Sequence, residues 1–463
     1  MTAGTPAGSS GRPHIVVVGG GYVGLYTALR LQNKLRRSEA SITVIDPRSY
    51  MTYQPFLPEA GAGNLEPRHV VVPLRKVLRR CQVLAGYVSS VDHGRKVVRF
   101  VPHQGEACDV TYDILVMAVG SVVRTLPIPG LKDCAIGFKT VEEAIYLRNH
   151  VLARLDVAAS TTDQELRRKA LTFVFVGGGY AGVEALAELE DMAVYAMRYY
   201  DGLHPSDMRW VMVEATGRIL PEVSWDMARY TVDRLSERRI EVLLNTRVKS
   251  VEGGRVVLDD GQEFDADTIV WTAGVRPNPL TERTDLPIDD RKRIRCTEFL
   301  TVEGVDDAWA AGDCAAVPDL TKGPDEYTSP SAQHAVRQAK QLAANIVASL
   351  RGGRLQPYQH AYAGSVASLG LHKGVAQVYG IKLRGWPAWV LHRTYHLARV
   401  PTFNRKSRIA ADWTLALFFQ REIVSLGAFA NPRREFEEAA SPSNGAPTGN
   451  GAAPKKKAPA KAR

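Results

Sequence analysis

Residues 16–31 read VVVGGGYVGLYTALRL, and residues 174–189 repeat the pattern as VFVGGGYAGVEALAEL. Each copy has a β-branched run, a glycine-rich turn and a stretch with helical apolar spacing, which together predict a strand–turn–helix unit. The copies lie 158 residues apart, so we interpret them as a duplicated unit and not as the period of a repeat protein. Apolar runs alternate with helical patterns around both copies, and this alternation predicts an α/β protein with parallel sheets.

The glycines of the first copy are spaced for contact with a pyrophosphate. In Gly19-x-Gly21-x-x-Gly24, the first glycine allows a tight turn, the second lets the backbone approach the ligand, and the third lets the helix pack closely on the strand. Asp46 ends the next expected strand, 22 residues after Gly24, where a carboxylate binds a ribose hydroxyl pair. Together these features predict a dinucleotide site, and a glycine-rich turn without a ligand is the alternative.

The second copy carries the same spacing at Gly177, Gly179 and Gly182. Its expected carboxylate is Glu214, 32 residues after Gly182. A carboxylate here accepts a hydrogen bond from a free 2′-hydroxyl and repels a 2′-phosphate, which favours NADH over NADPH. Arg218, four residues further on, would weaken that exclusion.

Composition and charge limit the class of protein. The chain has 463 residues, 45% hydrophobic and 23% charged, which excludes a wholly disordered, collagen-like or coiled-coil protein. The five cysteines, at 81, 108, 134, 296 and 314, show no metal-ligand spacing, so we expect no metal site. Their odd number argues against a disulfide framework, so we expect the protein to work in a reducing cytoplasm. The net charge of +10 is concentrated near the C-terminus, with +8 in residues 371–421 and +5 in residues 441–463. An anionic partner surface is therefore expected to face this region.

With these motifs, the chain resembles the flavoprotein reductases that bind two dinucleotides, and most closely the type II NADH dehydrogenases. The resemblance covers about residues 13–430. It rests on GGGYVG with Asp46, TYQPFLPEAGAGNLEP at 52–67, AVGS at 118–121, GGGYAGVE with Glu214, WTAGV at 271–275, AAGD at 310–313 and AQHAVRQ at 332–338.

The resemblance implies two Rossmann-like folds, with the NADH-binding fold inserted in the FAD-binding fold. FAD would lie on Gly19, Gly21, Gly24 and Asp46, with Asp313 at its ribityl or phosphate region. NADH would lie on Gly177, Gly179, Gly182 and Glu214, and Gly120 and Gly274 would mark the turns where the chain crosses between the folds. The expected divisions are a disordered segment at 1–12, the FAD fold at 13–165 and 291–370, the NADH fold at 166–290, a membrane-associating region at 371–440 and a disordered basic tail at 441–463.

The resemblance also implies two catalytic side chains, Glu184 and Gln333. In the family the glutamate that corresponds to Glu184 lies near the flavin and nicotinamide and has a proposed role in proton transfer to quinone. A carboxylate in a first helical turn is also explained by the helix dipole. Glu188, one turn on, would extend the proton path. Gln333 matches the first glutamine of the family pattern AQxAxQ, which lines the quinone pocket.

Two features leave alternatives open. Tyr53, Gln54 and Pro55 fall where the family places the chain beside the isoalloxazine ring, although Tyr53 is equally explained as a packed loop residue. At the sixth position of AQxAxQ this chain has Arg337. A charged donor in place of a neutral amide leaves the identity of the quinone, and quinone use itself, open.

Residues 385–400 (GWPAWVLHRTYHLARV) have the composition of a helix that lies in a membrane interface, because tryptophan borders apolar residues and basic residues flank them. Ile409, Trp413 and Leu417 continue the apolar spacing. A dimer interface or ordinary core helices are the alternative. As a helix, the segment has an apolar face with Trp386, Trp389, Val390, Leu397 and Val400, and a polar face with His392, His396 and Arg399.

We therefore expect a membrane-peripheral NADH:quinone oxidoreductase on the cytoplasmic face of the plasma membrane. A hydride passes from NADH to FAD, and two electrons pass to a membrane quinone without proton pumping. The expected partners are NADH, the quinone, an anionic membrane surface and a second copy in a homodimer, with no specific nucleic acid. The alternatives are a soluble reductase of a ferredoxin-like partner, a sulfide:quinone reductase with cysteines near the flavin, and a non-catalytic NADH sensor.

Overall fold

The computed structural model describes residues 11–323, 325–360, 364–419, 421–426, 433–434 and 436–437. The chain divides into a compact unit over Met1–Ser425 and a second unit over Leu426–Arg463, and all helices and strands named here lie in the first. The predicted basic tail at 441–463 and residues 1–10 of the predicted N-terminal segment lie outside the described residues.

The first glycine motif follows β1 in a seven-stranded sheet with the order β20-β8-β1-β2-β5-β6-β7. The strands from β20 to β5 pair in parallel, and β5, β6 and β7 form an antiparallel extension. The β-branched residues of β1 are buried, as expected for a strand covered on both faces. The bounds are β1 His14–Val18, β2 Ser41–Asp46, β5 Gln82–Asp92, β6 Val97–Pro102, β7 Cys108–Thr111, β8 Ile114–Met117 and β20 Ala308–Ala310.

The second glycine motif follows β11 in a five-stranded, all-parallel sheet with the order β10-β17-β11-β12-β13. Its edge strand β10 begins at Ala135, upstream of residue 166, where we placed the start of the NADH fold. A three-residue strand is too short to show an apolar period, so no sequence pattern marks it. The bounds are β10 Ala135–Gly137, β11 Thr172–Val176, β12 Arg209–Val213, β13 Ile240–Leu243 and β17 Thr268–Trp271.

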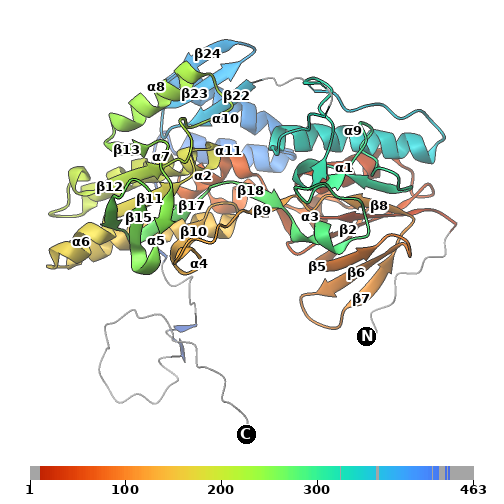
Figure 1. Ribbon diagram of the computed structural model, residues 1–463, viewed down its shortest axis with the longest axis horizontal. Helices are drawn as coiled ribbons and strands as arrows, with labels where there is room; N and C mark the ends of the chain where they lie inside the picture. The colour runs from red at the N-terminus through yellow and green to blue at the C-terminus, as the bar shows by residue number, and fades with distance from the viewer. Residues whose placement is uncertain are drawn as a thin grey trace, which may run out of the picture. The chain divides into compact units, whose positions relative to one another are not determined.

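The two sheets stand side by side, and a short antiparallel pair, β9 (Ser121–Val123) and β18 (Val275–Pro277), lies between them (Figure 1). The segment by which the chain leaves the first sheet (β9) therefore lies next to the segment by which it returns (β18). The indole Nε1 of Trp271 donates a hydrogen bond to the carbonyl of Arg124 at 2.8 Å. This bond connects the end of β17 in the second sheet to the residue that follows β9.

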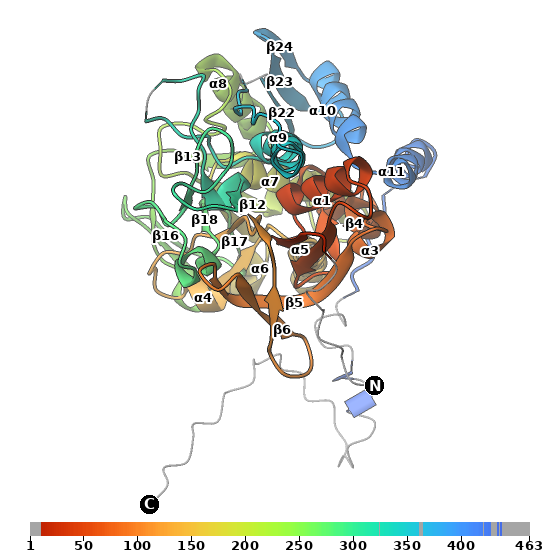
Figure 2. The ribbon, with the colours of Figure 1, turned by 90° about the vertical axis from the view of Figure 1, so that its right-hand side faces the viewer.

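Helices cover the sheets and bring the two motifs together. Helix α1 packs on β1 and β2, and α9 runs along α1 (Figure 2). Helix α7, which follows the second motif, contacts α2 and α5 as well as its own sheet. A capping box between Thr140 and Glu143 begins α5. The bounds are α1 Tyr22–Lys34, α2 Leu57–Gly61, α5 Val141–Ser160, α7 Tyr180–Ala196, α8 Trp225–Ser236 and α9 Ala332–Leu350.

The C-terminal region contains an antiparallel sheet followed by two helices. Strand β23 pairs with β22 and β24, and α10 packs on all three strands (Figure 2). Among the described residues, no helix has the length and apolar character needed to cross a bilayer. The bounds are β22 Gly364–Ser368, β23 Gly374–Val378, β24 Ile381–Arg384, α10 Trp386–Arg399 and α11 Phe403–Leu415. The smaller elements are β3 Tyr50–Thr52, β4 Val71–Pro73, β14 Val248–Ser250, β15 Arg255–Leu258, β16 Glu263–Asp265, β19 Ile294–Arg295, β21 Ala315–Ala316, α3 Leu74–Val77, α4 Leu131–Cys134 and α6 Gln164–Ala170.

The predicted faces of α10 are wrong. His392, assigned to the polar face, is only 1% exposed, and Trp389 is buried beside it, whereas Trp386 is 60% exposed. The histidine turns inward because buried carboxylates on α2 and α7 lie opposite it. Similarly, Ile409 of α11 is buried, and the exposed apolar side chains near it are Phe403, Leu415, Leu417, Phe418 and Phe419.

A buried ion pair attaches both C-terminal helices to α2. The Arg393 guanidinium bonds to both carboxylate oxygens of Glu59, with NH2–Oε2 at 2.8 Å and Nε–Oε1 at 3.3 Å. The guanidinium also lies over the rings of Trp389 and Trp413, at 4.0 and 4.8 Å from their centroids. Trp413 Nε1 donates to the same carboxylate at 3.0 Å. This joint, Glu59–Arg393–Trp389–Trp413, connects the C-terminal helices to the segment at 52–67.

Candidate active site

The turn after β1 can be built only with glycine at two positions. Gly19 has φ +103°, and a Cβ there would lie 2.4 Å from the Ala118 carbonyl oxygen. A Cβ on Gly24 would lie 1.8 Å from the Gly19 carbonyl oxygen. At Gly21 a Cβ would meet nothing within 4 Å, so the amide end of α1 opens into free space. This is the arrangement in which backbone amides and the helix dipole receive an anionic group.

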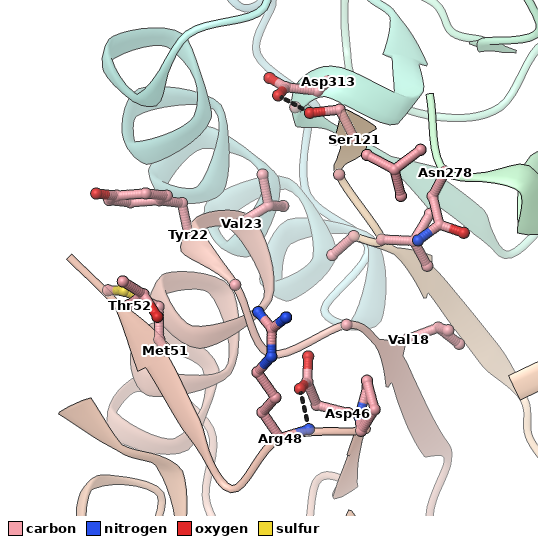
Figure 3. Close-up of a pocket in the computed structure, with 18 of the residues that line it drawn as sticks. Val18, Tyr22, Val23, Asp46, Arg48, Met51, Thr52, Ser121, Asn278 and Asp313 are labelled. Carbon is pink, nitrogen blue, oxygen red and sulfur yellow. Dashed lines mark hydrogen bonds between the residues drawn. The ribbon is translucent and has the colours of Figure 1, made fainter. Parts of the chain in front are cut away.

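Asp46 is fixed beside this turn. Its Oδ2 accepts a hydrogen bond from the Gly20 amide at 2.6 Å, and its Oδ1 accepts one from the Arg48 amide at 2.7 Å. Burial raises the pKa of Asp46, and these hydrogen bonds only partly offset the effect. Asp46 and Arg48 stand on one side of a cavity of about 460 Å³ (Figure 3). We call it the first cavity.

The other end of the first cavity carries a hydrogen-bonded chain of three side chains, of which Figure 3 labels Ser121 and Asp313. Lys139 Nζ donates to Ser121 Oγ at 2.7 Å, and Ser121 Oγ donates to Asp313 Oδ2 at 2.6 Å. Burial lowers the pKa of Lys139, while the charges of Asp313 and Glu143 raise it in part. Sequence reasoning found Asp313 and missed Lys139, because a lone lysine ahead of a helix N-cap belongs to no motif.

The second glycine turn repeats the first. Gly177 has φ +112°, and a Cβ on Gly182 would lie 2.0 Å from the Gly177 carbonyl oxygen, whereas the space at Gly179 is open. Glu214 Oε2 accepts from the Gly178 amide at 2.6 Å, as Asp46 accepts from Gly20. The shared geometry of the two turns supports the interpretation of a duplicated dinucleotide-binding unit.

Arg218 is engaged elsewhere than at Glu214. Its NH2 donates to the backbone carbonyls of Leu220, Pro221 and Val223, and its guanidinium lies 4.9 Å from the Trp225 ring centroid. Glu214 Oε1 is held instead by the amide and hydroxyl of Thr216. The expected weakening of the discrimination against a 2′-phosphate therefore has no support in this geometry.

A second cavity, also of about 460 Å³, adjoins the first. It receives Glu184 from α7, Gln333 and Arg337 from α9, and His396 from α10. The residues that line both cavities are Tyr22, Gln54, Val123, Lys139, Asp313 and Ala332. Because the two cavities share walls, groups bound in them would lie within reach of each other.

Glu184 lies at the inner wall of the second cavity. Its Oε1 accepts from the Ser368 amide at 2.8 Å and lies 3.2 Å from His392 Nε2. Glu188 is completely buried one turn further on, where it accepts hydrogen bonds from Ser368 Oγ at 2.6 Å and Asn64 Nδ2 at 3.0 Å. Burial and the charge of Glu59 raise the pKa of Glu188 to about 7. A carboxyl group whose pKa is raised toward neutrality therefore lies behind the wall, one helical turn from Glu184.

Gln333 and Arg337 stand one helical turn apart on the α9 wall. Gln333 Nε2 donates to the Gly364 carbonyl at 3.2 Å, and its Oε1 lies 3.1 Å from His360 Nε2. Arg337 NH1 donates to the Gln333 carbonyl. Gln338 points away from this cavity, because its Oε1 accepts from the Gly312 amide at 2.7 Å and fixes the turn before Asp313. Thus Arg337, and not the neighbouring glutamine, contributes to the cavity.

The structure brings all the predicted site residues to these two cavities or to the glycine turns beside them. Gly120 and Gly274 lie directly before β9 and β18, with φ +63° and +93°. Tyr53, Gln54 and Pro55 line the second cavity. The residues that sequence reasoning missed, Lys139, His360 and the inward role of His392, belong to no local motif and become neighbours only through tertiary packing.

All five cysteines lie in the described part of the chain, and none of them lines either cavity. Cys296 and Cys314 are fully buried, and burial raises the pKa of both thiols, that of Cys314 to about 11. Thiols held in the protonated state away from the cavities do not form the reactive pair that a sulfide or disulfide reductase needs.

Comparison with known proteins agrees with this geometry. The family model of the pyridine nucleotide-disulphide oxidoreductases matches residues 13–339, which defines the class of protein. The chain is 31% identical to the type II NADH:quinone oxidoreductase of Staphylococcus saprophyticus, over 81% of this chain and 92% of the relative. It is 32% identical, over the same shares, to the corresponding protein of Staphylococcus aureus strain NCTC 8325. This chain belongs to the type II NADH:quinone oxidoreductase family.

The fold is also found in a solved structure. NDH2 from Plasmodium falciparum, in complex with NADH, matches with a TM-score of 0.81 at 19% identity, over 89% of this chain and 99% of the other. The predicted α/β architecture with two Rossmann-like folds is thereby confirmed.

Proposed function

We propose that the chain is an FAD-dependent NADH:quinone oxidoreductase, with FAD on the first glycine turn and NADH on the second. The observation that carries this proposal is the pair of matched turns, Gly19–Asp46 and Gly177–Glu214, together with two adjoining cavities that share a wall. An arrangement of this kind holds two dinucleotides within the range of direct transfer.

The residues of the first cavity fit FAD. The open space at Gly21 and the amide end of α1 suit a pyrophosphate, and Asp46 suits ribose hydroxyls. When bound, FAD supplies a ring that takes two electrons as a hydride and releases them to a quinone. Around it the chain supplies the donors, because Lys139 and Ser121 form a polar end opposite Arg48.

The second cavity is the proposed acceptor site. Gln333 and Arg337 offer hydrogen-bond donors to a carbonyl oxygen, and Glu184 lies opposite them. The reaction so written takes one proton from solution and requires no transfer of protons across a bilayer, so we propose that it is not proton-pumping. Glu214 selects NADH through the ribose hydroxyls.

We further propose that the protein works at the cytoplasmic face of an anionic membrane. Exposed apolar side chains on and after α11, including Phe403, Leu417 and Phe418, occur within residues 371–421, which carry nine lysines and arginines and one aspartate. Exposed aromatic residues beside basic ones are typical of interfacial binding, and each nearby cation adds about 1 kcal/mol on an anionic surface. The homodimer stays a prediction, to be checked by analytical ultracentrifugation.

One experiment tests the catalytic proposal. The purified chain is mixed anaerobically with NADH and then with a soluble quinone, while NADH and flavin absorbance are followed. We expect a yellow protein that is bleached by NADH and regains its colour with quinone. A colourless protein that takes up no flavin, or a reduced flavin indifferent to quinone, would contradict the proposal, and the latter would favour the sensor alternative.

A second experiment tests the membrane proposal. Flotation with vesicles containing anionic lipid is compared for the full chain and for the triple variant Phe403→Ser, Leu417→Ser, Phe418→Ser, with the exposed Leu166→Ser of α6 as a control outside the region and outside both cavities. We expect the triple variant alone to lose binding. Equal flotation of all three proteins would refute the assignment of this surface.

A further inference from the structure

Two histidines of α10 connect the buried carboxylates to the second cavity. His392 is fully enclosed, with Nε2 3.2 Å from Glu184 Oε1. Its ring centroid lies 4.7 Å from that of His396, edge to face. His396 lines the cavity, and its Nδ1 lies 3.3 Å from the Tyr53 hydroxyl. Glu184, His392 and His396 thus lie one after another between the buried carboxylates and the cavity wall, with an ion-pair contact between the first two and a ring contact between the two histidines.

The inner histidine has an unpaired ring nitrogen. Within the described part of the chain, neither ring nitrogen of His392 has a hydrogen bond of ordinary geometry: Nε2 has only its ion-pair contact with Glu184 at 3.2 Å, and Nδ1 is buried without a partner. A buried imidazole nitrogen without a partner costs free energy, so a purely structural histidine at this position would be expected to satisfy it. A nitrogen without a partner, in a ring that contacts His396, is available to pass a proton to that ring.

The charges around the pair divide the proton unequally. Burial lowers the pKa of His392, but the hydrogen bond and charge of Glu184, with Glu59 and Glu188, outweigh burial and raise it overall. Burial, then the charges of His392 and Arg399, lower the pKa of His396 far below its ordinary value. Of the two rings, His392 therefore holds a proton more tightly than His396 does. Among the described residues, the charged and titratable groups that face the pair are Glu184 and Glu188 of α7, Glu59 of α2, Arg393, Tyr395 and Arg399 of α10, and the hydroxyl of Tyr53.

We propose that His396 protonates the quinone bound in the second cavity and that His392, held by Glu184, returns a proton to His396. The inference rests on the proposed function. It makes His396 a catalytic residue, because it faces the substrate, and His392 a relay residue that acts through it.

The balance of the reaction requires such a donor. Reduction of a quinone to a quinol takes two electrons and forms two O–H bonds. NADH gives both electrons and one hydrogen as a hydride and is oxidised to NAD⁺, so each turnover needs one more proton from solution. An N–H bond of His392 breaks as one forms on His396. The second O–H bond of the quinol then forms as the His396 imidazolium gives up an N–H proton and returns to its neutral form, and Glu184 and Glu188 pass a solvent proton back to His392.

The kinetic test separates the two halves of the reaction in the FAD-loaded full chain. The variants are His396→Gln and His392→Gln. The control is His372→Asn. The ring of His372 packs on Trp389 of α10, with 4.8 Å between the centroids, but His372 does not line the second cavity. Reduction by NADH and reoxidation by a soluble short-chain quinone are followed by stopped flow at several pH values.

We expect reoxidation to slow about tenfold or more in His396→Gln, since a positioned general acid contributes at least that much. Reduction by NADH should stay within about twofold of wild type, because it needs no proton from the cavity. In His392→Gln the slowing of reoxidation should be smaller at low pH, because protons from the solvent can then reach His396 in place of the proton from His392. Wild-type reoxidation and pH dependence in both variants would overturn the relay.

A measurement independent of turnover covers variants that fail to fold. Nuclear magnetic resonance of ¹⁵N-histidine in the wild-type FAD-loaded chain should show His392 protonated at pH values where His396 is neutral, and Glu184→Gln should lower the pKa of His392. A neutral His392 at about pH 6 would overturn the proposal. If the wild type reduces flavin with NADH but does not reduce quinone, the proposed function itself fails, which is distinct from failure of the relay alone.

Discussion

Replacing Arg393 by methionine should destabilise the joint between α2 and the C-terminal helices by about 3–5 kcal/mol, the usual cost of removing one partner of a buried ion pair. The Arg393 side chain is 10% exposed and that of Glu59 is 1% exposed. The substitution leaves a buried carboxylate with one remaining side-chain donor, Trp413 Nε1. It also removes a cation from over two indole rings, each worth about 0.5–1 kcal/mol or more.

The assay is urea unfolding of the FAD-loaded chain, followed by tryptophan fluorescence and by release of the flavin. The double variant Glu59→Met with Arg393→Met should recover most of the lost stability, because the uncompensated charge is gone and Trp413 loses only one hydrogen bond, about 1 kcal/mol. Arg255→Met is the matched control, since the pair Arg255–Glu263 is 60% and 44% exposed and should cost under about 1 kcal/mol. An Arg393→Met variant no less stable than the control, or a double variant as unstable as the single, would refute the reasoning.

Three further predictions follow from the two turns and the buried wall. Gly24→Ala forces a Cβ to within 1.8 Å of the Gly19 carbonyl oxygen, so it should lower both the FAD content and the stability of the apoprotein. Gly21→Ala meets no such clash and should lower only the affinity for FAD. Flavin absorbance and thermal unfolding distinguish the two variants, and equal behaviour would count against the described turn. Glu214→Gln should raise the ratio of kcat/KM for NADPH to that for NADH about tenfold or more, because a neutral amide no longer repels a 2′-phosphate; an unchanged ratio would show that the discrimination lies elsewhere. The folded pKa of Glu188 is raised from 4.5 to about 7, so the native state binds the proton more tightly and stability falls as pH rises across that window. Glu188→Gln should therefore gain stability relative to wild type at about pH 8 compared with about pH 5, as measured by urea unfolding, and a constant difference would contradict the assignment.

Those parts of the site that depend on local geometry could be predicted from the sequence. A glycine turn with its strand, helix and carboxylate is encoded within one short stretch of chain, from His14 to Asp46 and from Thr172 to Glu214, because steric contacts between near neighbours determine it. For this reason the motif spacing alone located the pairs Gly19–Asp46 and Gly177–Glu214. The departure from the family pattern at Arg337 was also visible in the sequence, and the structure places this arginine in the lining of the second cavity.

Residues that meet only in the folded chain escaped prediction. His392 and Glu184 are separated by 208 positions, and no spacing rule connects them. The polar face of α10 was assigned to solvent because histidine and arginine usually lie there, whereas the carboxylates of α2 and α7 provide buried partners. Lys139 likewise acquires its role from Ser121 and Asp313, which reach it from other strands and turns.

The paired crossings β9 and β18 have a consequence for how such chains are assembled. Val123 lies opposite Val275, and Ser121 lies opposite Pro277, so the intervening stretch leaves and re-enters the first sheet at one place. A segment whose ends are adjacent behaves as a cassette: it can be excised, exchanged with the equivalent piece of another reductase, or closed with a short linker, without rethreading the host sheet. Coenzyme preference is then carried by the cassette through Glu214, whereas the second cavity is lined from both sides, by Glu184 of the cassette and by Gln333, Arg337 and His396 of the host, so an exchange of cassettes alters both.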